Sequence, residues 1–115
     1  MIAVIFEVWP AEVQTDRYLE LAAALRSSLE GTDGFLSVER FRSLTEPEKR
    51  LSLSFWRDEA AVRAWRNTSL HREAQADGRG GVFAGYRLRV AAVLRDYGMT
   101  ARDEAPADSR FAHGD

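Results

Sequence analysis

The sequence predicts an α+β domain, because stretches with the period-two hydrophobic pattern of β-strands alternate with stretches that have helical periodicity. Four strand-like stretches and two helical regions follow one another in the order β-α-β-β-α-β. A chain of 115 residues is long enough for one domain with a single, modest core.

The first predicted strand is IAVIFEVW, residues 2–9, in which β-branched and aromatic residues dominate. Pro10 ends this strand, because proline lacks the backbone N–H that a sheet requires. One face of the strand is entirely apolar, and the other face is apolar except for Glu7. We therefore expect both faces to be covered.

An amphipathic helix is predicted over residues 15–30, with Thr15 as its N-cap and Gly31 as its stop. The apolar positions with helical spacing are Tyr18, Leu21, Ala22, Leu25 and Leu29. Residues 35–44 and 50–56 then alternate between apolar and polar side chains on either side of the turn sequence TEPEK. These two stretches are predicted to form a β-hairpin.

A second helical region begins after Asp58, a predicted N-cap, and includes Trp65 in its apolar stripe. The sequence NTS interrupts it before a further turn or two that carries His71. After the connector DGRGG, residues 86–94 form the last predicted strand. The predicted domain spans residues 1–99, and residues 100–115, which lack periodicity, are expected to be a disordered tail.

This order of elements is that of the ferredoxin-like fold, in which both helices cover one face of a four-stranded antiparallel sheet. The opposite face of the sheet is then bare. The predicted strands carry apolar side chains on both faces, such as Phe6 on one and Ile5 on the other. Because a bare apolar face would be a large exposed patch, we expect a second copy to cover it in a sheet-to-sheet homodimer.

The composition excludes several classes of function. The absence of cysteine excludes disulfides, thiolate catalysis and cysteine metal sites, and no metal site is predicted. A net charge of −2 gives no reason to expect a nucleic-acid partner. No stretch approaches the roughly 18 consecutive apolar residues of a membrane span, and no basic region precedes the first apolar run. We therefore expect a cytoplasmic protein without a membrane partner.

The chain resembles the antibiotic biosynthesis monooxygenase family, within the dimeric α/β-barrel superfamily. The resemblance covers about residues 1–98 and depends on the stretches DGFLSVERFRS, LSLSFWRDEAAVRAW and NTSLH. The family pattern has a glycine at the second strand, a tryptophan ending the third, a tryptophan on the next helix and a histidine six residues later. Those places are occupied by Gly34, Trp56, Trp65 and His71.

The resemblance implies a cofactor-independent monooxygenase that acts on a small aromatic or quinol-like substrate without metal or flavin. We expect its pocket between the sheet and the second helical region, with a lining of Phe6, Trp56, Trp65, Leu70 and Phe83. Glu7 and His71 are the candidate bases, since a desolvated carboxylate or an imidazole can remove a phenolic proton near neutral pH. Glu7 has a structural alternative, which is pairing with an arginine such as Arg40 or Arg89 across the sheet.

Two other functions stay open. A non-catalytic dimeric domain that binds a small ligand or has a structural role predicts a salt-bridged Glu7 and a solvent-exposed His71. The haem-degrading members of the family share the helix tryptophan, here Trp65, but use an asparagine on the first strand and a histidine ten residues after the tryptophan. Glu7 and Gln75 occupy those two places, so haem degradation is the least favoured reading.

Overall fold

The structure is a computed structural model that describes residues 1–11 and 15–114. The side chains of residues 15, 69, 70, 73, 77 and 78 are not part of the description. Two predictions therefore lie outside the described residues: the N-cap role of Thr15 and the place of Leu70 in the pocket.

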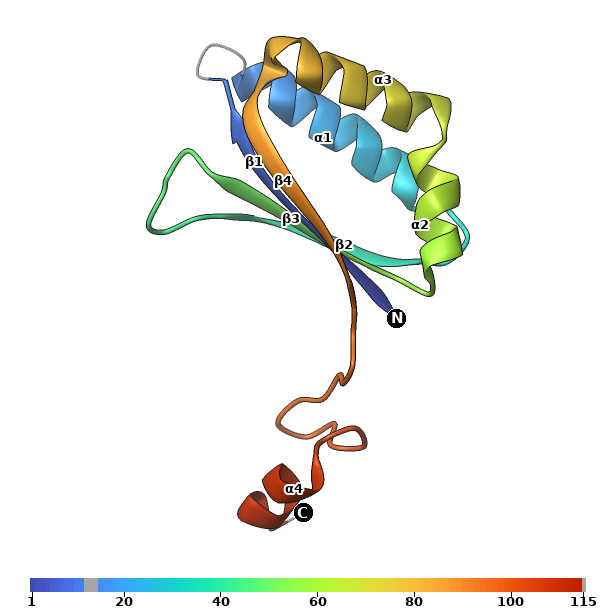
Figure 1. Ribbon diagram of the computed structural model, residues 1–115, viewed down its shortest axis with the longest axis vertical. Coiled ribbons are helices and arrows are strands. Elements are labelled where there is room, and N and C mark those ends of the chain that lie inside the picture. The colour runs from blue at the N-terminus through green and yellow to red at the C-terminus, as the bar shows by residue number, and fades with distance from the viewer. Residues whose placement is uncertain (12–14, 115) are drawn as a thin grey trace.

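The sheet has the strand order β2-β3-β1-β4, and neighbouring strands are antiparallel. Its strands are β1 (Ile2–Pro10), β2 (Phe35–Arg42), β3 (Arg50–Trp56) and β4 (Phe83–Ala92). The central strands β1 and β3 come from the two halves of the domain, and β4 lies beside β1 at one edge of the sheet (Figure 1). The predicted α+β, ferredoxin-like fold is confirmed.

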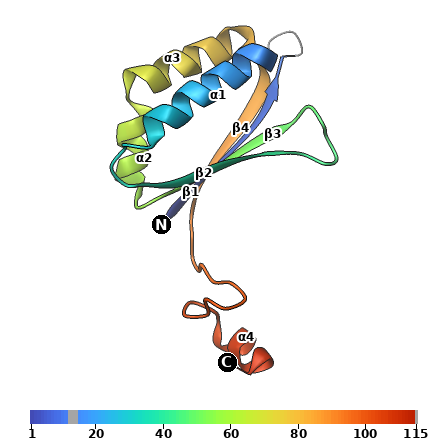
Figure 2. The same ribbon diagram turned by 180° about the vertical axis from the view of Figure 1, so that it is seen from behind.

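The helices α1 (Thr15–Leu29), α2 (Glu59–Arg66) and α3 (Ser69–Asp77) all lie on one face of the sheet (Figures 1 and 2). Asp58 is the N-cap of α2, as predicted, because its Oδ1 accepts the backbone N–H of Ala61 at 2.9 Å. Thr68 separates α2 from α3: its hydroxyl donates to the Trp65 carbonyl at 2.9 Å and accepts the His71 N–H at 3.3 Å. No described helix is long and apolar enough to cross a membrane.

The strand register decides which side chains face the helices. Phe6 of β1 pairs with Ser52 of β3, and both line the space beneath the helices. Glu7 pairs with Leu51 and therefore lies on the opposite face of the sheet. The core on the helical side includes Trp56, which is 1% exposed.

Gly34 lets α2 approach the start of β2. Its φ of +82° is in the left-handed region, and a Cβ at this position would lie 2.5 Å from the Cβ of Ala61. The carbonyl of Gly34 accepts the backbone N–H of Arg57 at 2.7 Å, and the Arg57 guanidinium binds both carboxylate oxygens of Asp33. A side chain at position 34 would therefore push α2 away from the sheet.

The face of the sheet opposite the helices is bare (Figures 1 and 2). The register places several large apolar side chains on it: Ile5, Trp9, Phe41, Leu51, Leu53 and Phe55. This composition agrees with the apolar pattern on which the homodimer prediction depends. The homodimer itself stays a prediction.

After β4, Val93 still donates its backbone N–H to the Met1 carbonyl at 3.0 Å, and the chain then extends away from both the sheet and the helices (Figure 1). We expected no regular structure after residue 99, but this segment contains the short helix α4 (Ala107–His113). Local contacts organise the segment, among them the Arg102 guanidinium 5.4 Å from the centre of the Tyr97 ring. Gly114, in a left-handed conformation, follows the helix.

Candidate active site

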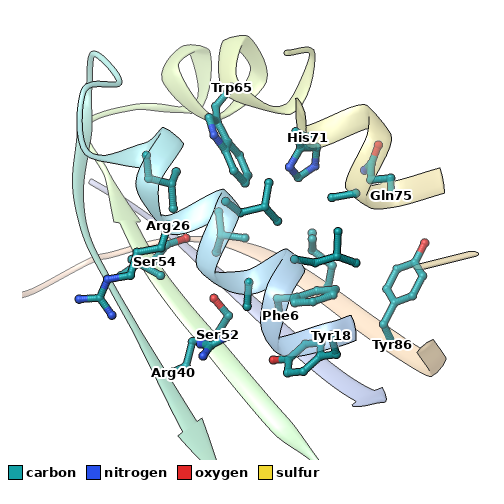
Figure 3. Close-up of a pocket in the computed structure, with 18 of the residues that line it drawn as sticks. Phe6, Tyr18, Arg26, Arg40, Ser52, Ser54, Trp65, His71, Gln75 and Tyr86 are labelled. Carbon is teal, nitrogen blue, oxygen red and sulfur yellow. The ribbon is translucent and has the colours of Figure 1, made fainter. Parts of the chain in front are cut away.

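A cavity of about 390 Å³ lies between the helices and the sheet (Figure 3). All four strands contribute to its floor, and α1, α2 and α3 supply its walls. Aromatic rings account for much of its surface: Phe6, Tyr18, Trp56, Trp65, Phe83 and Tyr86. A concave, mainly apolar site with a few polar groups is typical of a small-molecule pocket.

The structure brings together most of the side chains that the sequence predicted for the pocket. Phe6, Trp56, Trp65 and Phe83 line the cavity, and so does the candidate base His71. The prediction of a pocket beneath the second helical region therefore has a geometric basis. Substrate contacts of these residues stay predictions.

Trp65 and His71 form the most distinctive part of the wall. Their rings are 4.1 Å apart, centroid to centroid, and Trp65 also lies 5.6 Å from the ring of Trp56. The Nε1 of Trp65 and the Nδ1 of His71 are both buried, and neither has a hydrogen-bond partner among the described residues. Both side chains extend from the helices toward the interior of the cavity (Figure 3). Since buried polar atoms are usually hydrogen-bonded, two unpartnered nitrogens in one stretch of the wall are unusual.

Burial, and to a smaller extent the positive charges of Arg72 and Arg66, lower the pKa of His71 to about 4. The imidazole is therefore neutral at pH 7 in the empty cavity. A neutral imidazole with a free nitrogen can accept a proton or a hydrogen bond. An anion bound beside it would offset the arginines and raise its pKa.

Glu7 does not reach the cavity, and the structure corrects this expectation. Its carboxylate lies on the bare face of the sheet, where it forms ion pairs with Lys49 and Arg89. The Lys49 ammonium also lies 5.2 Å from the centre of the Trp9 ring. Hydrogen bonds from Lys49 and Arg89 hold the pKa of Glu7 below its ordinary value. The observed position is that of the structural alternative, in which Glu7 pairs with Arg89 across the sheet. A catalytic role for Glu7 in the cavity has no geometric basis.

Several polar cavity residues were missed by the sequence analysis. Tyr18 of α1 is only 5% exposed, and burial raises the pKa of its hydroxyl although Arg40, 5.8 Å from its ring, acts in the opposite direction. Tyr86 and Gln75 also line the cavity. The signal for Tyr18 was its place on the apolar stripe of the first helix, where a phenol must carry its hydroxyl into the core. Nothing in the local sequence pointed to the other two.

The cavity does not match the haem pattern described above. Gln75 lines the cavity at the place where that pattern needs a histidine, and Glu7 points to the other face of the sheet. Residues 1–11 and 15–114 contain no group of three or more His, Asp or Glu side chains that could hold a metal ion. Among described side chains, the chemistry available in the cavity is that of His71, two phenols, two serine hydroxyls, an amide, one carboxylate and the surrounding arginines.

An antiparallel sheet with helices over one face and an aromatic cavity between them defines the chain as a ferredoxin-like domain. Residues 1–77 match the sequence profile of the antibiotic biosynthesis monooxygenase family, and the chain belongs to this family. A relative from Pyricularia oryzae, named jasmonate monooxygenase ABM, is 50% identical over 93 residues, which are 81% of this chain. The match spans only 43% of that relative's own length.

Two further similarities agree with this assignment. The uncharacterized protein YqjZ of Bacillus subtilis is 35% identical over 94 residues, covering 81% of this chain and 79% of YqjZ. The structure of Rv0793 from Mycobacterium tuberculosis superimposes with a TM-score of 0.76 at 18% identity, covering 84% of this chain and 98% of Rv0793. At that identity the structural likeness concerns the fold alone.

Proposed function

We propose that this protein is a monooxygenase that oxidises a small aromatic or quinol-like molecule in the cavity beneath α1, α2 and α3, without a metal or an organic cofactor. The observation that carries the proposal is the pair of buried, unpartnered nitrogens on an aromatic wall, Trp65 Nε1 and His71 Nδ1. Membership in the antibiotic biosynthesis monooxygenase family supports the reaction type, as does the name of the Pyricularia oryzae relative.

In the proposed reaction, Trp65 Nε1 donates a hydrogen bond to an oxygen of the substrate and His71 accepts a phenolic proton. The resulting anion is rich in electrons, and the ring carbon that is a CH₂ group in the keto form bonds to one atom of dioxygen. Loss of the remaining hydrogen as a proton and cleavage of the O–O bond leave a carbonyl and release water. The CH₂ carbon loses four electrons and dioxygen gains four, so no external reductant is required.

The positive environment of His71 bears on this step. Arg72 and Arg66 disfavour a proton on the imidazole of the empty protein. A phenolate in the cavity would reverse this effect, because opposite charges in a poorly solvated site stabilise one another. The base therefore gains its proton affinity only when the substrate is bound.

The alternative function is a non-catalytic domain that binds a small apolar ligand. One observation favours it: Glu7 is ion-paired on the bare face of the sheet, as that function predicts. Another opposes it, because His71 is partly buried and its Nδ1 is inaccessible to solvent, whereas the non-catalytic function predicts an exposed histidine.

Oxygen consumption tests the proposal directly. The purified protein is mixed with a panel of dihydroxynaphthalenes and hydroxyanthrones, and products are identified by mass. His71→Gln is expected to lower turnover by about 10² to 10⁴-fold, as for loss of a general base. His113→Gln, a change at an exposed histidine in α4, is the matched control and should leave turnover unchanged. Jasmonate is assayed with and without NADPH, because hydroxylation of an unactivated carbon needs two additional electrons.

No oxygen consumption with any member of the panel would refute the proposed function. Full activity of His71→Gln would refute the role of the base while leaving the reaction type in place. Trp65→Phe keeps an aromatic ring but removes Nε1, and it should raise KM or lower kcat without unfolding the protein.

A further inference from the structure

The charge of the cavity is opposite to the charge of the chain. Among the described charged side chains that line the cavity are four arginines, Arg26, Arg40, Arg72 and Arg79, and one carboxylate, Glu39. The chain as a whole has a net charge of −2. Within the described part of the chain, none of the four guanidiniums forms an ion pair with a carboxylate. All four arginines are exposed, so the described side chains give the cavity a positively charged rim, which favours an anion.

Arg79 and Tyr86 together form a set of hydrogen-bond donors at the β4 side of the cavity. Arg79, in the short helical turn η2 (Gly78–Val82), donates from Nη1 to the Tyr86 hydroxyl oxygen at 3.1 Å. The hydroxyl of Tyr86 keeps its own hydrogen to donate, and the guanidinium keeps further N–H groups. The Tyr86 ring is fixed by Phe6 and Phe83, at 5.7 and 6.3 Å between ring centres.

A second donor group lies on α3, close in sequence to Arg79. Arg72 donates from Nη1 to Gln75 Oε1 at 2.8 Å. This contact uses only the amide oxygen of Gln75, and its NH₂ group is a further donor. Gln75 lies beside His71 in the cavity wall (Figure 3). The positive charge of Arg72 also lowers the pKa of His71, so this arginine acts on the imidazole electrostatically.

We propose that the ligand of this cavity is an apolar molecule that carries a carboxylate, with the carboxylate bound by Arg79 and Tyr86 and the apolar body packed among Phe6, Phe83 and Trp56. The inference concerns the same cavity as the proposed function and deepens it by naming the substrate class. An arginine with an adjacent hydroxyl donor suits a carboxylate, because the two donors can bind its two oxygens at once. The remaining end of the ligand then lies toward Trp65 and His71, where the unpartnered nitrogens are found.

Calorimetric titration with matched pairs of probes tests the inference. The acids are 4-phenylbutanoate and 6-phenylhexanoate, and each is compared with its primary amide, which has the same shape without the charge. Neither acid has a phenol, so binding is measured without oxidation. We expect the wild type to bind at least one acid about tenfold or more tightly than its amide, as for a charge-assisted hydrogen bond.

Variants locate the carboxylate site. Arg79→Gln and Tyr86→Phe should each weaken binding of the acid about tenfold and change binding of the amide by less than about twofold. The matched control is Arg87→Gln, on the same strand as Tyr86 but with its side chain on the opposite face of the sheet. It should leave both affinities unchanged, and circular dichroism verifies that each variant is folded.

Three results would overturn the inference: equal binding of acid and amide, equal weakening of both by Arg79→Gln, or no binding of either acid at millimolar concentration. Its failure is distinguishable from failure of the proposed function. Oxidation of uncharged phenols with no preference for acids would refute the carboxylate site alone. A clear preference for acids in a protein that consumes no oxygen would support the site and refute the monooxygenase proposal.

Discussion

The low pKa of His71 predicts a specific dependence of stability on pH. In the folded protein its pKa is about 4, compared with 6.5 for an unperturbed histidine. Between these two values the unfolded chain binds more protons than the folded chain, so the free energy of unfolding falls as the pH is lowered. At 1.36 kcal/mol for each unit, the 2.5-unit difference corresponds to an upper limit of about 3 kcal/mol, of which about 2 kcal/mol is lost between pH 7 and pH 5.

The perturbation is His71→Gln, which removes the titrating group and nearly preserves its volume. Urea unfolding followed by tryptophan fluorescence gives the free energy of unfolding at pH 7, 6 and 5. The carboxylates are shared by both proteins, so the difference between the two pH profiles isolates His71. We expect the variant to lose about 2 kcal/mol less than the wild type over this interval.

His113→Gln is the control, because this side chain is exposed on α4 and its replacement should leave the wild-type profile in place. Parallel profiles for the wild type and His71→Gln would show that the imidazole is solvated in the folded protein. That result would contradict the buried position of His71 and, with it, the argument for a neutral base in the cavity.

Three further predictions concern the fold, the assembly and haem. Gly34→Ala should lower the free energy of unfolding by about 1 to 3 kcal/mol, because φ is +82° and the new Cβ would meet Ala61; Gly31→Ala, with nothing within 4 Å, should be close to neutral in urea unfolding. The protein should sediment as a homodimer at micromolar concentration, and Leu53→Arg, on the bare sheet face, should shift it toward the monomer; a wild-type species of 13.0 kDa would contradict the sheet-to-sheet assembly. Haem titration should give no stoichiometric complex ligated by histidine, since Gln75 replaces the expected ligand; a sharp Soret band that disappears in His71→Ala would contradict this.

The sequence by itself determined the order and type of the elements, because these depend on interactions between near neighbours. The alternation in IAVIFEVW and RLSLSFW corresponds to strands β1 and β3, and the helical spacing after Asp58 corresponds to α2. The break at NTS corresponds to the boundary between α2 and α3. The N-cap at Asp58 was equally local, since its carboxylate binds an N–H three residues away. The aromatic pocket residues could also be predicted, because Trp56 and Trp65 lie on the apolar faces of consecutive elements.

Only the tertiary structure decided which face of β1 the helices cover, and therefore whether the Glu7 side chain lies in the cavity or on the bare face of the sheet. The period of two places Glu7 and Phe6 on opposite faces, but both faces of the strand are apolar enough to be buried, so the pattern alone cannot assign them. Packing of the helices over Phe6 leaves Glu7 on the bare face, between Lys49 and Arg89.

The tertiary structure also decided which polar side chains lie around the cavity. Tyr18, Arg40, Gln75, Arg79 and Tyr86 come from five different segments of the chain and meet only because α1 and α3 pack side by side over the sheet (Figure 1). Each looks like an ordinary surface or core residue in its own segment. Their position around one apolar cavity follows from contacts between residues far apart in the sequence, and a local sequence pattern does not contain this information.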